Sequence, residues 1–296
     1  MEAIKEALTE WFESLFQEVL IHGICGSLYE TFGVINNKVG EIAENVAKSP
    51  SEWNGGIFAL VQNLSETVML PIAGLILTYV MVYELISMIM DKNNFHDFPP
   101  SDIMKWIFKT YMSVVLVTNV FDITMAVFDV AKHVVNSSSS IITADTSVDP
   151  FESHDVLWAA LESHSLGELL QIYVQSLLIG ISIQIIGILI TVVIYGRMIE
   201  IYLLTSLAPI PFATLMNKEQ ASIGQNYFKV LLAIGFQGFL IMVCVGIYAV
   251  LIQGIGLTLE PNNVLRAMWE CLGYSILLCF TLFKSASISK SIFNAH

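Results

Sequence analysis

Charged residues are scarce in this chain, and their scarcity excludes an ordinary soluble domain. Only 13% of the 296 residues are Asp, Glu, Lys or Arg, while 55% are hydrophobic. A soluble domain carries about 25% charged residues. The apolar residues also occur in blocks, which favours several membrane-spanning helices over one large core. The few charges are mostly acidic, 26 against 13 basic, and this balance disfavours a broad surface for nucleic-acid phosphates.

Cysteine and histidine are also few and dispersed. The four cysteines and six histidines form neither a CxxC pair nor an HExxH motif, so the sequence supports neither a disulfide framework nor a metal site. The chain also lacks a Walker A sequence, a GxSxG motif and a recognisable pair of catalytic carboxylates. We therefore expect no enzyme activity and no cofactor.

What the chain does have is an exceptionally long hydrophobic run over residues 169–216. Its only charges are Arg197 and Glu200. About 20 apolar residues cross a bilayer as a helix, so this run is too long for one crossing and, without a turn signal, awkward for two. It ends at Pro209 and Pro211, which disfavour a continued helix.

The beginning of this run carries a helix-capping signal. Ser165 precedes Glu168 by three residues, which is the spacing of a capping box. A helix from there to about Leu207 is roughly 58 Å long, against about 30 Å for the hydrocarbon core of a bilayer. We expect one over-long helix, and a break near Gly196 is the alternative.

The apolar blocks together predict an all-α, polytopic membrane helix bundle with about five transmembrane helices and an N-terminal amphipathic helix. The expected spans cover residues 68–90, 103–130, 169–207, 227–252 and 268–283. These spans divide the chain into an extracytoplasmic N-terminal region (1–67), transmembrane helices 1–2 (68–131), an acidic extracytoplasmic loop (132–168) and transmembrane helices 3–5 with a Pro-rich cytoplasmic turn (169–296).

The amphipathic helix is expected over residues 3–21. Its apolar residues recur at helical spacing and glutamates fill much of the rest, whereas Lys5 is its single basic residue. Helices that lie on membranes are usually rich in Lys and Arg. This helix can lie on a membrane, pack on its own protein or pack against a partner.

The distribution of basic residues predicts the orientation of the chain. With five spans and the N-terminus outside, eight basic residues fall on the cytoplasmic side and five on the outer side. Cytoplasmic segments of membrane proteins carry an excess of Lys and Arg. We therefore expect a multi-pass protein of the bacterial cytoplasmic membrane, with its N-terminus outside and its C-terminus inside.

Several charged residues are expected inside the spans, where ionisable groups are costly and face a bundle interior or water. Glu84 and Lys109 lie at a similar level of the first two spans and can pair. The alternative is that Lys109 extends to the interface and Glu84 is locally solvated. Arg197 and Glu200 are three residues apart and can neutralise each other as a structural ion pair.

The second span also carries a polar face. Asn119 and Asp122 are three residues apart, so their side chains lie on one side of a helix. This face fits a conduit for a transported substrate, and it equally fits polar packing between helices, which is the commoner case.

The sequence after residue 165 resembles a known family. The segment RMIEIYLLTSLAPIPFATL (197–215), followed by IGQNYFK (223–229) and QGFL (237–240), is similar to TrbL-type polytopic inner-membrane subunits of type IV secretion and conjugation systems, in the form found on conjugative elements of Gram-positive bacteria. The resemblance is best over residues 165–290. Its conspicuous positions are Pro209, Pro211 and Gln237, which we regard as candidate structural or conduit residues.

This resemblance implies a channel or scaffold subunit that helps to pass single-stranded DNA or protein across the membrane. It implies assembly with other secretion subunits in a homo-oligomeric ring, with a pentamer as one form, and transient contact with single-stranded DNA. The N-terminal helix would then be a natural contact for a neighbouring subunit.

The alternative is a secondary transporter or permease for a small solute. Such transporters often have broken helices in matching halves, and the break at Pro209 and Pro211 has no evident counterpart in the first half of the sequence. An integral-membrane enzyme is a third possibility, but it lacks candidate residues.

Overall fold

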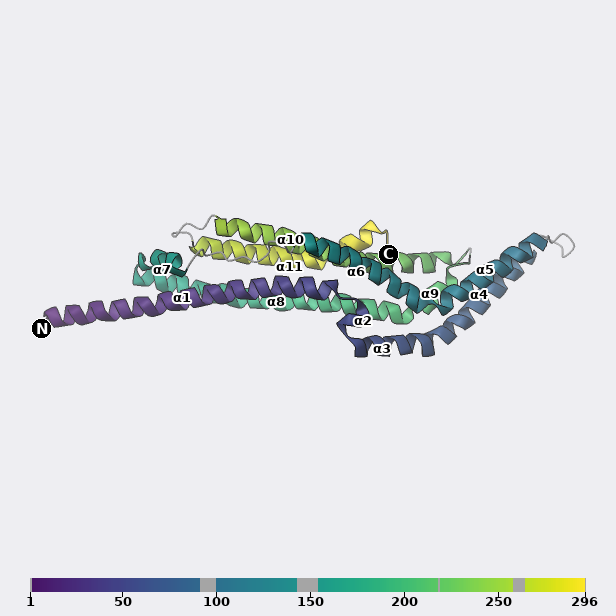
Figure 1. Cartoon of the computed structure of the whole chain (residues 1–296), viewed down its shortest axis with the longest axis horizontal. Helices are drawn as coiled ribbons and strands as arrows, with labels where there is room; N and C mark the ends of the chain where they lie inside the picture. The colour runs from purple at the N-terminus through teal and green to yellow at the C-terminus, as the bar shows by residue number, and fades with distance from the viewer. Residues whose placement is uncertain (1, 91–99, 143–153, 218, 258–263, 296) are drawn as a thin grey trace. The chain divides into compact units, whose positions relative to one another are not determined.

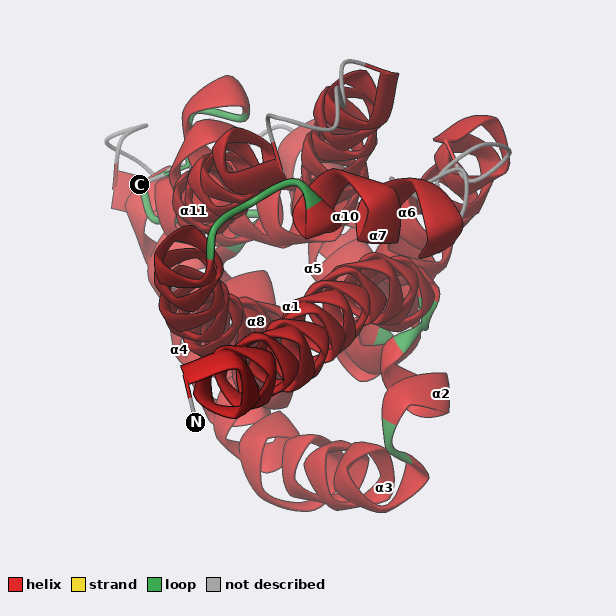
Figure 2. Ribbon diagram, turned by 90° about the vertical axis from the view of Figure 1, so that its left-hand side faces the viewer, coloured by secondary structure: helices red, strands yellow, loops and turns green. Residues whose placement is uncertain are grey.

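The computed structural model describes residues 2–90, 100–142, 154–217, 219–257 and 264–295. All regular secondary structure in these residues is helical (Figure 2), which confirms the predicted all-α class. The helices, labelled in Figure 1, are α1 (Glu2–Ala47), α2 (Pro50–Trp53), α3 (Gly55–Leu64), the π-helical turn η1 (Ser65–Met69), α4 (Leu70–Met90), α5 (Pro100–Thr118), α6 (Val120–Ile142), α7 (His154–Glu162), α8 (Leu166–Leu207), α9 (Pro209–Thr214), α10 (Ala221–Leu257) and α11 (Val264–Ile292).

Four continuous helical segments among the described residues are long and apolar enough to cross a membrane, and a bent helix pair makes a fifth candidate. The four are Gly55–Met90, Leu166–Leu207, Ala221–Ile255 and Leu265–Ile292. The bent pair consists of α5 and α6 up to Ser138. These four or five candidates confirm the predicted polytopic membrane helix bundle. The span expected over residues 103–130 differs from the prediction, because it is interrupted between α5 and α6.

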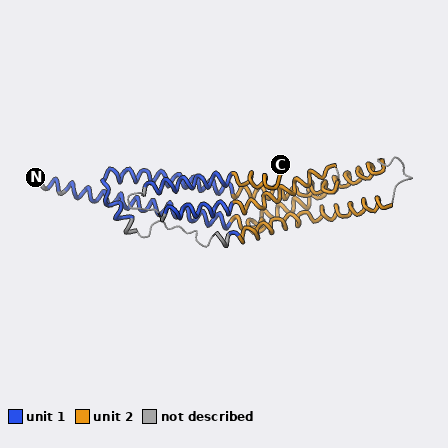
Figure 3. The backbone as a smooth tube through the Cα atoms, turned by 90° about the horizontal axis from the view of Figure 1, so that it is seen from above, with its two compact units in different colours: residues 1–44, 138–193, 241–283 blue, residues 45–137, 194–240, 284–296 orange. Residues whose placement is uncertain are grey.

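The chain divides into two compact units, which Figure 3 shows in blue and orange. Unit 1 comprises residues 1–44, 138–193 and 241–283, and unit 2 comprises residues 45–137, 194–240 and 284–296. Every residue predicted as a candidate site belongs to unit 2.

In unit 1, α1 lies along the first half of α8. A Cβ added at Gly180 would lie 3.3 Å from Thr31 Oγ1, and one added at Gly187 would lie 3.3 Å from Lys38 Cε. The two contacts are seven residues apart on each helix and ascend together, so α1 and α8 run parallel. Small residues permit this close approach of two helices in a membrane protein.

Helix α1 is much longer than the helix expected over residues 3–21, and it continues through four glycines to Ala47. A helical glycine costs up to about 1 kcal/mol relative to alanine. Packing in unit 1 offsets this cost, because a row of α1 side chains spaced alternately four and three residues apart is buried: Ile21, Cys25, Leu28, Phe32, Ile35, Val39 and Ile42. Tertiary contacts thus extend the helix beyond its local signal.

Helix α8 forms as a single element of 42 residues. Its first turn is capped as the sequence predicts, because the Ser165 amide donates to Glu168 Oε2 at 2.8 Å and the Glu168 amide donates to Ser165 Oγ at 3.4 Å. It ends at Leu207, directly before the Pro-rich segment. The over-long helix is confirmed, and a hairpin break near Gly196 is excluded.

The first candidate span begins earlier than expected, at Gly55 instead of residue 68, because α3, η1 and α4 form one continuous helical rod. Pro71 has no amide hydrogen to donate to the preceding turn. The π-helical turn Ser65–Met69 lies directly before it, and the Leu70 amide donates to Ser65 O within this turn. A π turn changes the local hydrogen-bonding register, so the rod accommodates the proline without a break.

The core of unit 2 joins α4, α5, α6, α9 and parts of α8 and α10. Its fully buried members include Ala73, Val80, Met198, Ala213 and Leu231.

Candidate functional site

The predicted pair between the first two spans is present. Lys109 Nζ of α5 donates to Glu84 Oε1 of α4, and the two side chains are only 23% and 16% exposed. Trp106, one turn earlier on α5, donates its indole N–H to Met81 O at 3.1 Å. Lys105, at a similar level, instead forms an exposed pair with Asp102 at 3.0 Å. Lys109 is therefore the lysine that ties α5 to α4.

The polar face of the second span lies at its break. The axes of α5 and α6 differ in direction by 66°. Asn119 Nδ2 donates to Val115 O at 2.8 Å, and Thr118 Oγ1 donates to Val114 O at 2.9 Å. These side chains compete with backbone amides for the carbonyls of the preceding turn, a recognised cause of helix bending. The span expected over residues 103–130 is therefore bent at Asn119.

The side chains at this break remain exposed. Thr118, Asn119 and Asp122 are all exposed, while Val120 and Phe121 between them are buried. Asp122 lies in the first turn of α6, where a carboxylate interacts favourably with the positive end of the helix. The predicted polar face therefore exists, and it consists of a helix terminus and the irregular residue before it.

Arg197 does not pair with Glu200, so that prediction is wrong. Its side chain is buried, at 6% exposure. Nε donates to Ile234 O at 3.3 Å and Nη2 donates to Gly235 O at 3.4 Å, both on α10. Nη1 has no hydrogen-bond partner among the described residues. The guanidinium thus lies against backbone carbonyls of a neighbouring helix, without an acidic counter-ion in the described part of the chain.

A glycine makes room for this arginine. A Cβ at Gly238 would lie 2.9 Å from Arg197 Nη2 and 3.2 Å from Arg197 Cζ. Contacts under 3.0 Å require a neighbour to move. The Gln-Gly dipeptide that contributed to the family resemblance therefore has a packing reason for its glycine.

Glu200 pairs with α11 instead. Lys290 Nζ donates to Glu200 Oε1 at 2.9 Å. Nearby on α11, Ser289 Oγ donates to Ala233 O at 2.5 Å. Gln237 Nε2 donates to Ser285 Oγ at 3.2 Å, and Gln237 Oε1 is buried without a partner among the described residues.

We define the side chains of these contacts together as the polar cluster: Arg197 and Glu200 of α8, Gln237 of α10, and Ser285 and Lys290 of α11. Arg197, Gln237 and Ser285 are buried, whereas Glu200 and Lys290 are 39% and 38% exposed. The polar cluster connects three helices of unit 2 through side chains from segments far apart in the sequence. The predicted residues Arg197, Glu200 and Gln237 come together here, whereas Glu84 and Lys109 form a separate pair and Asn119 and Asp122 lie at the break. Lys290 and Ser285 were missed, because no local pattern links them to α8 or α10.

The Pro-rich segment is a packed corner. Pro209 occupies the first turn of the short helix α9, where its missing amide hydrogen has no cost. Helix α9 packs against α4 and α5, and Pro209 is buried while Pro211 is partly buried. A Cβ at Gly224 would lie 2.6 Å from Pro211 O, so only glycine fits there. Tyr227 closes the corner by donating its hydroxyl to Leu204 O at 2.6 Å.

Sequence reasoning also missed an ion pair before the first span. Lys132 Nζ of α6 donates to Glu52 Oε1 and Oε2 at 2.5 and 2.6 Å. Glu52 also accepts from the Ser49 amide at 3.0 Å. Together these bonds, led by the one from Lys132, lower the pKa of Glu52 to about 2. The signal was readable in part, because Ser49 and Glu52 have the spacing of a capping box.

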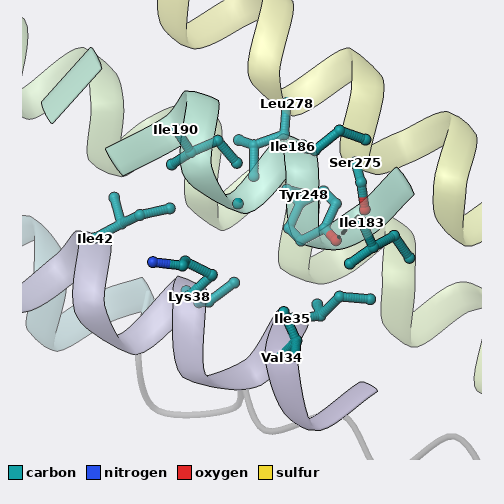
Figure 4. A pocket seen from close by; sticks show the side chains of 12 residues that line it. Val34, Ile35, Lys38, Ile42, Ile183, Ile186, Ile190, Tyr248, Ser275 and Leu278 are labelled. Atoms are coloured by element: carbon teal, nitrogen blue, oxygen red, sulfur yellow. Dashed lines mark hydrogen bonds between the residues drawn. The ribbon is translucent and has the colours of Figure 1, made fainter. Parts of the chain in front are cut away.

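Unit 1 contains a partly buried lysine, Lys38, that no sequence motif indicates. Lys38 Nζ donates to Glu41 Oε2 at 2.5 Å and to Thr191 Oγ1 at 2.9 Å. Figure 4 shows Lys38 beside a mainly apolar pocket, with the hydrogen-bonded Tyr248 and Ser275 among its lining residues. The pocket has about 310 Å³ of empty volume, part of it open to the surroundings. Lys38 thus fixes α1 on α8 from the edge of an apolar pocket.

The described residues contain no group of three or more His, Cys, Asp or Glu side chains arranged to hold a metal ion. The candidate site is therefore made of charges and amides placed among apolar helices. Such an arrangement can fix helix positions or line a path for a substrate.

Comparison with known proteins identifies the family. A family model described as "TrbL/VirB6 plasmid conjugal transfer like protein" matches residues 35–209, more than half of the chain. The matched region begins well before residue 165, where the resemblance was expected to be best, and it includes Glu84, Lys109 and Arg197. No curated protein and no solved structure matches the chain. The chain belongs to the TrbL/VirB6 family, and it is a multi-pass membrane component of a conjugal transfer system.

Proposed function

We propose that the protein is a channel or scaffold subunit that assembles with copies of itself into a ring, such as a pentamer, and helps to pass single-stranded DNA or protein across the membrane. It works together with the other subunits of the transfer machine. The N-terminus lies outside and the C-terminus lies in the cytoplasm.

The observation that carries this proposal is the exposed polar break between α5 and α6. Irregular backbone is tolerated at membrane depth only where it is covered by protein or lines a water-filled cavity. Asn119 and Asp122 are exposed in the single chain, and an intramembrane carboxylate exposed to lipid is costly. A neighbouring subunit, water in a conduit, or both would remove this cost.

The same break governs the proposed orientation. If α5 and α6 together cross the membrane, the five spans place the two termini on opposite sides. If the pair enters and returns on one side, four spans remain and the termini share a side. The excess of basic residues on the side assigned to the cytoplasm supports the first arrangement.

A solute transporter is the alternative. The break at Pro209 and Pro211 was expected to have no counterpart in the first half of the chain. This expectation is wrong, because α5 and α6 are separated by a break at Asn119. The two breaks are nevertheless not equivalent. The first separates helices of 19 and 23 residues, whereas the second separates a helix of 42 residues from one of six. The two breaks therefore do not indicate a pair of repeats with matching broken helices, as many transporters have.

Deletion of the gene in its host separates the two functions. We expect DNA transfer to be lost while growth and solute uptake stay normal. Complementation with the wild-type chain should restore transfer, and complementation with the double variant Asn119→Leu and Asp122→Leu should not. Lys105→Gln, which alters an exposed residue on α5, is the matched control and should restore transfer. Intact transfer in the deletion strain would overturn the proposal.

A further inference from the structure

The first five turns of α1 carry a large apolar surface that the described part of the chain does not cover. We call this surface the α1 apolar face. Its seven members are between 39% and 70% exposed: Ile4, Leu8, Trp11, Phe12, Leu15, Phe16 and Val19. At about 100° per residue these positions occupy one side of the helix. Exposed apolar patches of this kind mark interaction sites.

The face is uncovered because α1 extends past the helices that it packs against in unit 1 (Figure 1). Before residue 17, the hydrogen bonds and ring contacts of the described residues stay within α1, such as Thr9 to Lys5 O and Trp11 with Phe12. Gln17 is the first to reach another element, where Nε2 donates to Glu162 O at 3.1 Å and to His164 O at 3.4 Å. Burial begins at Leu20 and Ile21. Packing on the chain's own helices, one of the possibilities left by the sequence, therefore does not account for the face.

The charges around the α1 apolar face disfavour two of its possible binding partners, an anionic membrane surface and a second copy of this chain. Glu6, Glu10, Glu13 and Glu18 are all exposed on this part of the helix, and Lys5 is its single basic residue. An anionic bilayer surface would repel these carboxylates, whereas helices that lie on membranes carry Lys and Arg. Pairing with a second copy would bring eight glutamates beside one apolar seam, and like charges that flank a helix pair oppose its formation.

We propose that the α1 apolar face docks into an apolar groove of a different protein whose rim carries Lys and Arg side chains. An amphipathic helix that lays anchors at i, i+3, i+4 and i+7 into a groove is a recurring mode of recognition. Trp11, Phe12 and Phe16 are the main anchors, because large aromatic side chains contribute most to such interfaces. Glu13 and Glu18, which lie nearest the edges of the face on the helix, meet the basic rim, and the four glutamates together steer the encounter.

This inference deepens the proposed function, on which it rests for its setting in cells that carry the assembled transfer machine. The test is site-specific photo-crosslinking of the full-length protein in those cells. The photoreactive residue p-benzoylphenylalanine is placed at Phe12 or Phe16 on the face. It is placed at Glu10 as a control on the polar side and at Phe280, an exposed phenylalanine of α11, as a matched control away from α1.

We expect Phe12 and Phe16 to give the same product with a protein other than this chain, and Glu10 and Phe280 to give none of it. Peptide mapping should place the crosslink among apolar residues flanked by Lys or Arg. Reversal of the four glutamates to lysine should lower the yield at Phe16 by roughly tenfold, as expected when complementary charges become like charges. The single change Glu219→Lys, at an exposed glutamate elsewhere, should leave the yield unchanged.

Four results would overturn the inference. These are a product at twice the chain's 32.9 kDa mass, adducts with lipid alone, no product at either position, and a partner segment with an acidic rim. If the glutamate-to-lysine variant inserted into the membrane to a different extent, the yield of lipid adducts from p-benzoylphenylalanine at Phe280 would also change. Loss of DNA transfer in the deletion strain without a heterologous crosslink refutes this inference and leaves the proposed function intact.

Discussion

Replacement of Arg197 by methionine is the perturbation whose effect on stability depends most on the geometry of the polar cluster. A buried arginine that is paired with an acid cannot be removed cheaply, since loss of one partner of a buried pair costs about 3–5 kcal/mol. Arg197 has no acidic partner among the described residues, and its two hydrogen bonds to carbonyls are long, at 3.3 and 3.4 Å. Its removal should therefore not cause a loss of this size.

The expected magnitude follows from two opposing contributions. An arginine at the centre of a membrane helix costs about 2.5–3.5 kcal/mol on the insertion scale, and methionine removes that cost. The two long hydrogen bonds contribute at most about 1.5 kcal/mol each, and the smaller side chain adds a packing loss below about 1.5 kcal/mol. These contributions place the Arg197→Met variant between about 2 kcal/mol less stable and about 2 kcal/mol more stable than the wild type, short of the loss expected for a broken buried ion pair.

The assay is equilibrium unfolding of the purified full-length protein in detergent micelles, followed by intrinsic fluorescence. Arg266→Met is the matched control, because Arg266 forms an exposed pair with Glu270 and such pairs contribute about 0–1 kcal/mol. A loss of 3 kcal/mol or more in Arg197→Met, with a neutral control, would show that the guanidinium has a counter-ion.

The remaining predictions concern three other contacts. Glu84→Lys and Lys109→Glu should each destabilise the protein by about 2–4 kcal/mol in the same unfolding assay, and the double reversal should recover most of the loss; failure of the double variant to recover argues against the pair. Gly238→Ala should lower stability by about 1–3 kcal/mol through overpacking against Arg197 and Val135. The combination with Arg197→Met should recover the part of this loss that is due to Arg197, and fully additive effects would contradict that contact. Because the pKa of Glu52 is lowered, its ionised form stabilises the fold above the usual glutamate pKa of about 4.3, and this contribution disappears as the pH falls toward about 2. Glu52→Gln should thus cost up to about 1 kcal/mol at pH 7 and progressively less below pH 4.5, and a pH-independent cost would count against the lowered pKa.

Local sequence signals predicted the parts of the fold that depend on neighbouring residues. The capping box at Ser165 and Glu168 and the prolines after Leu207 determine where α8 begins and ends, and both were readable. The Glu84–Lys109 pair was also predictable, since α4 and α5 are consecutive and place the two residues at a similar level.

Features that depend on distant segments could not be predicted in this way. Arg197 and Glu200 are compatible with a local pair, but α10 offers carbonyls to the first and α11 offers Lys290 to the second. The extension of α1 to Ala47 depends on burial against α8. The polar residues around Asn119 fit a continuous helix with one polar face as well as a break between two helices, so the sequence alone did not predict the break.

Crosslinking of a strand in transit tests whether this chain forms part of the conduit. A photoreactive residue at Asp122 should form adducts with single-stranded DNA during active transfer, and the same residue at Phe280 should not. These adducts should depend on the transfer machine and disappear when transfer is blocked. DNA adducts confined to other subunits, with only lipid adducts from Asp122, would contradict a conduit built from this chain.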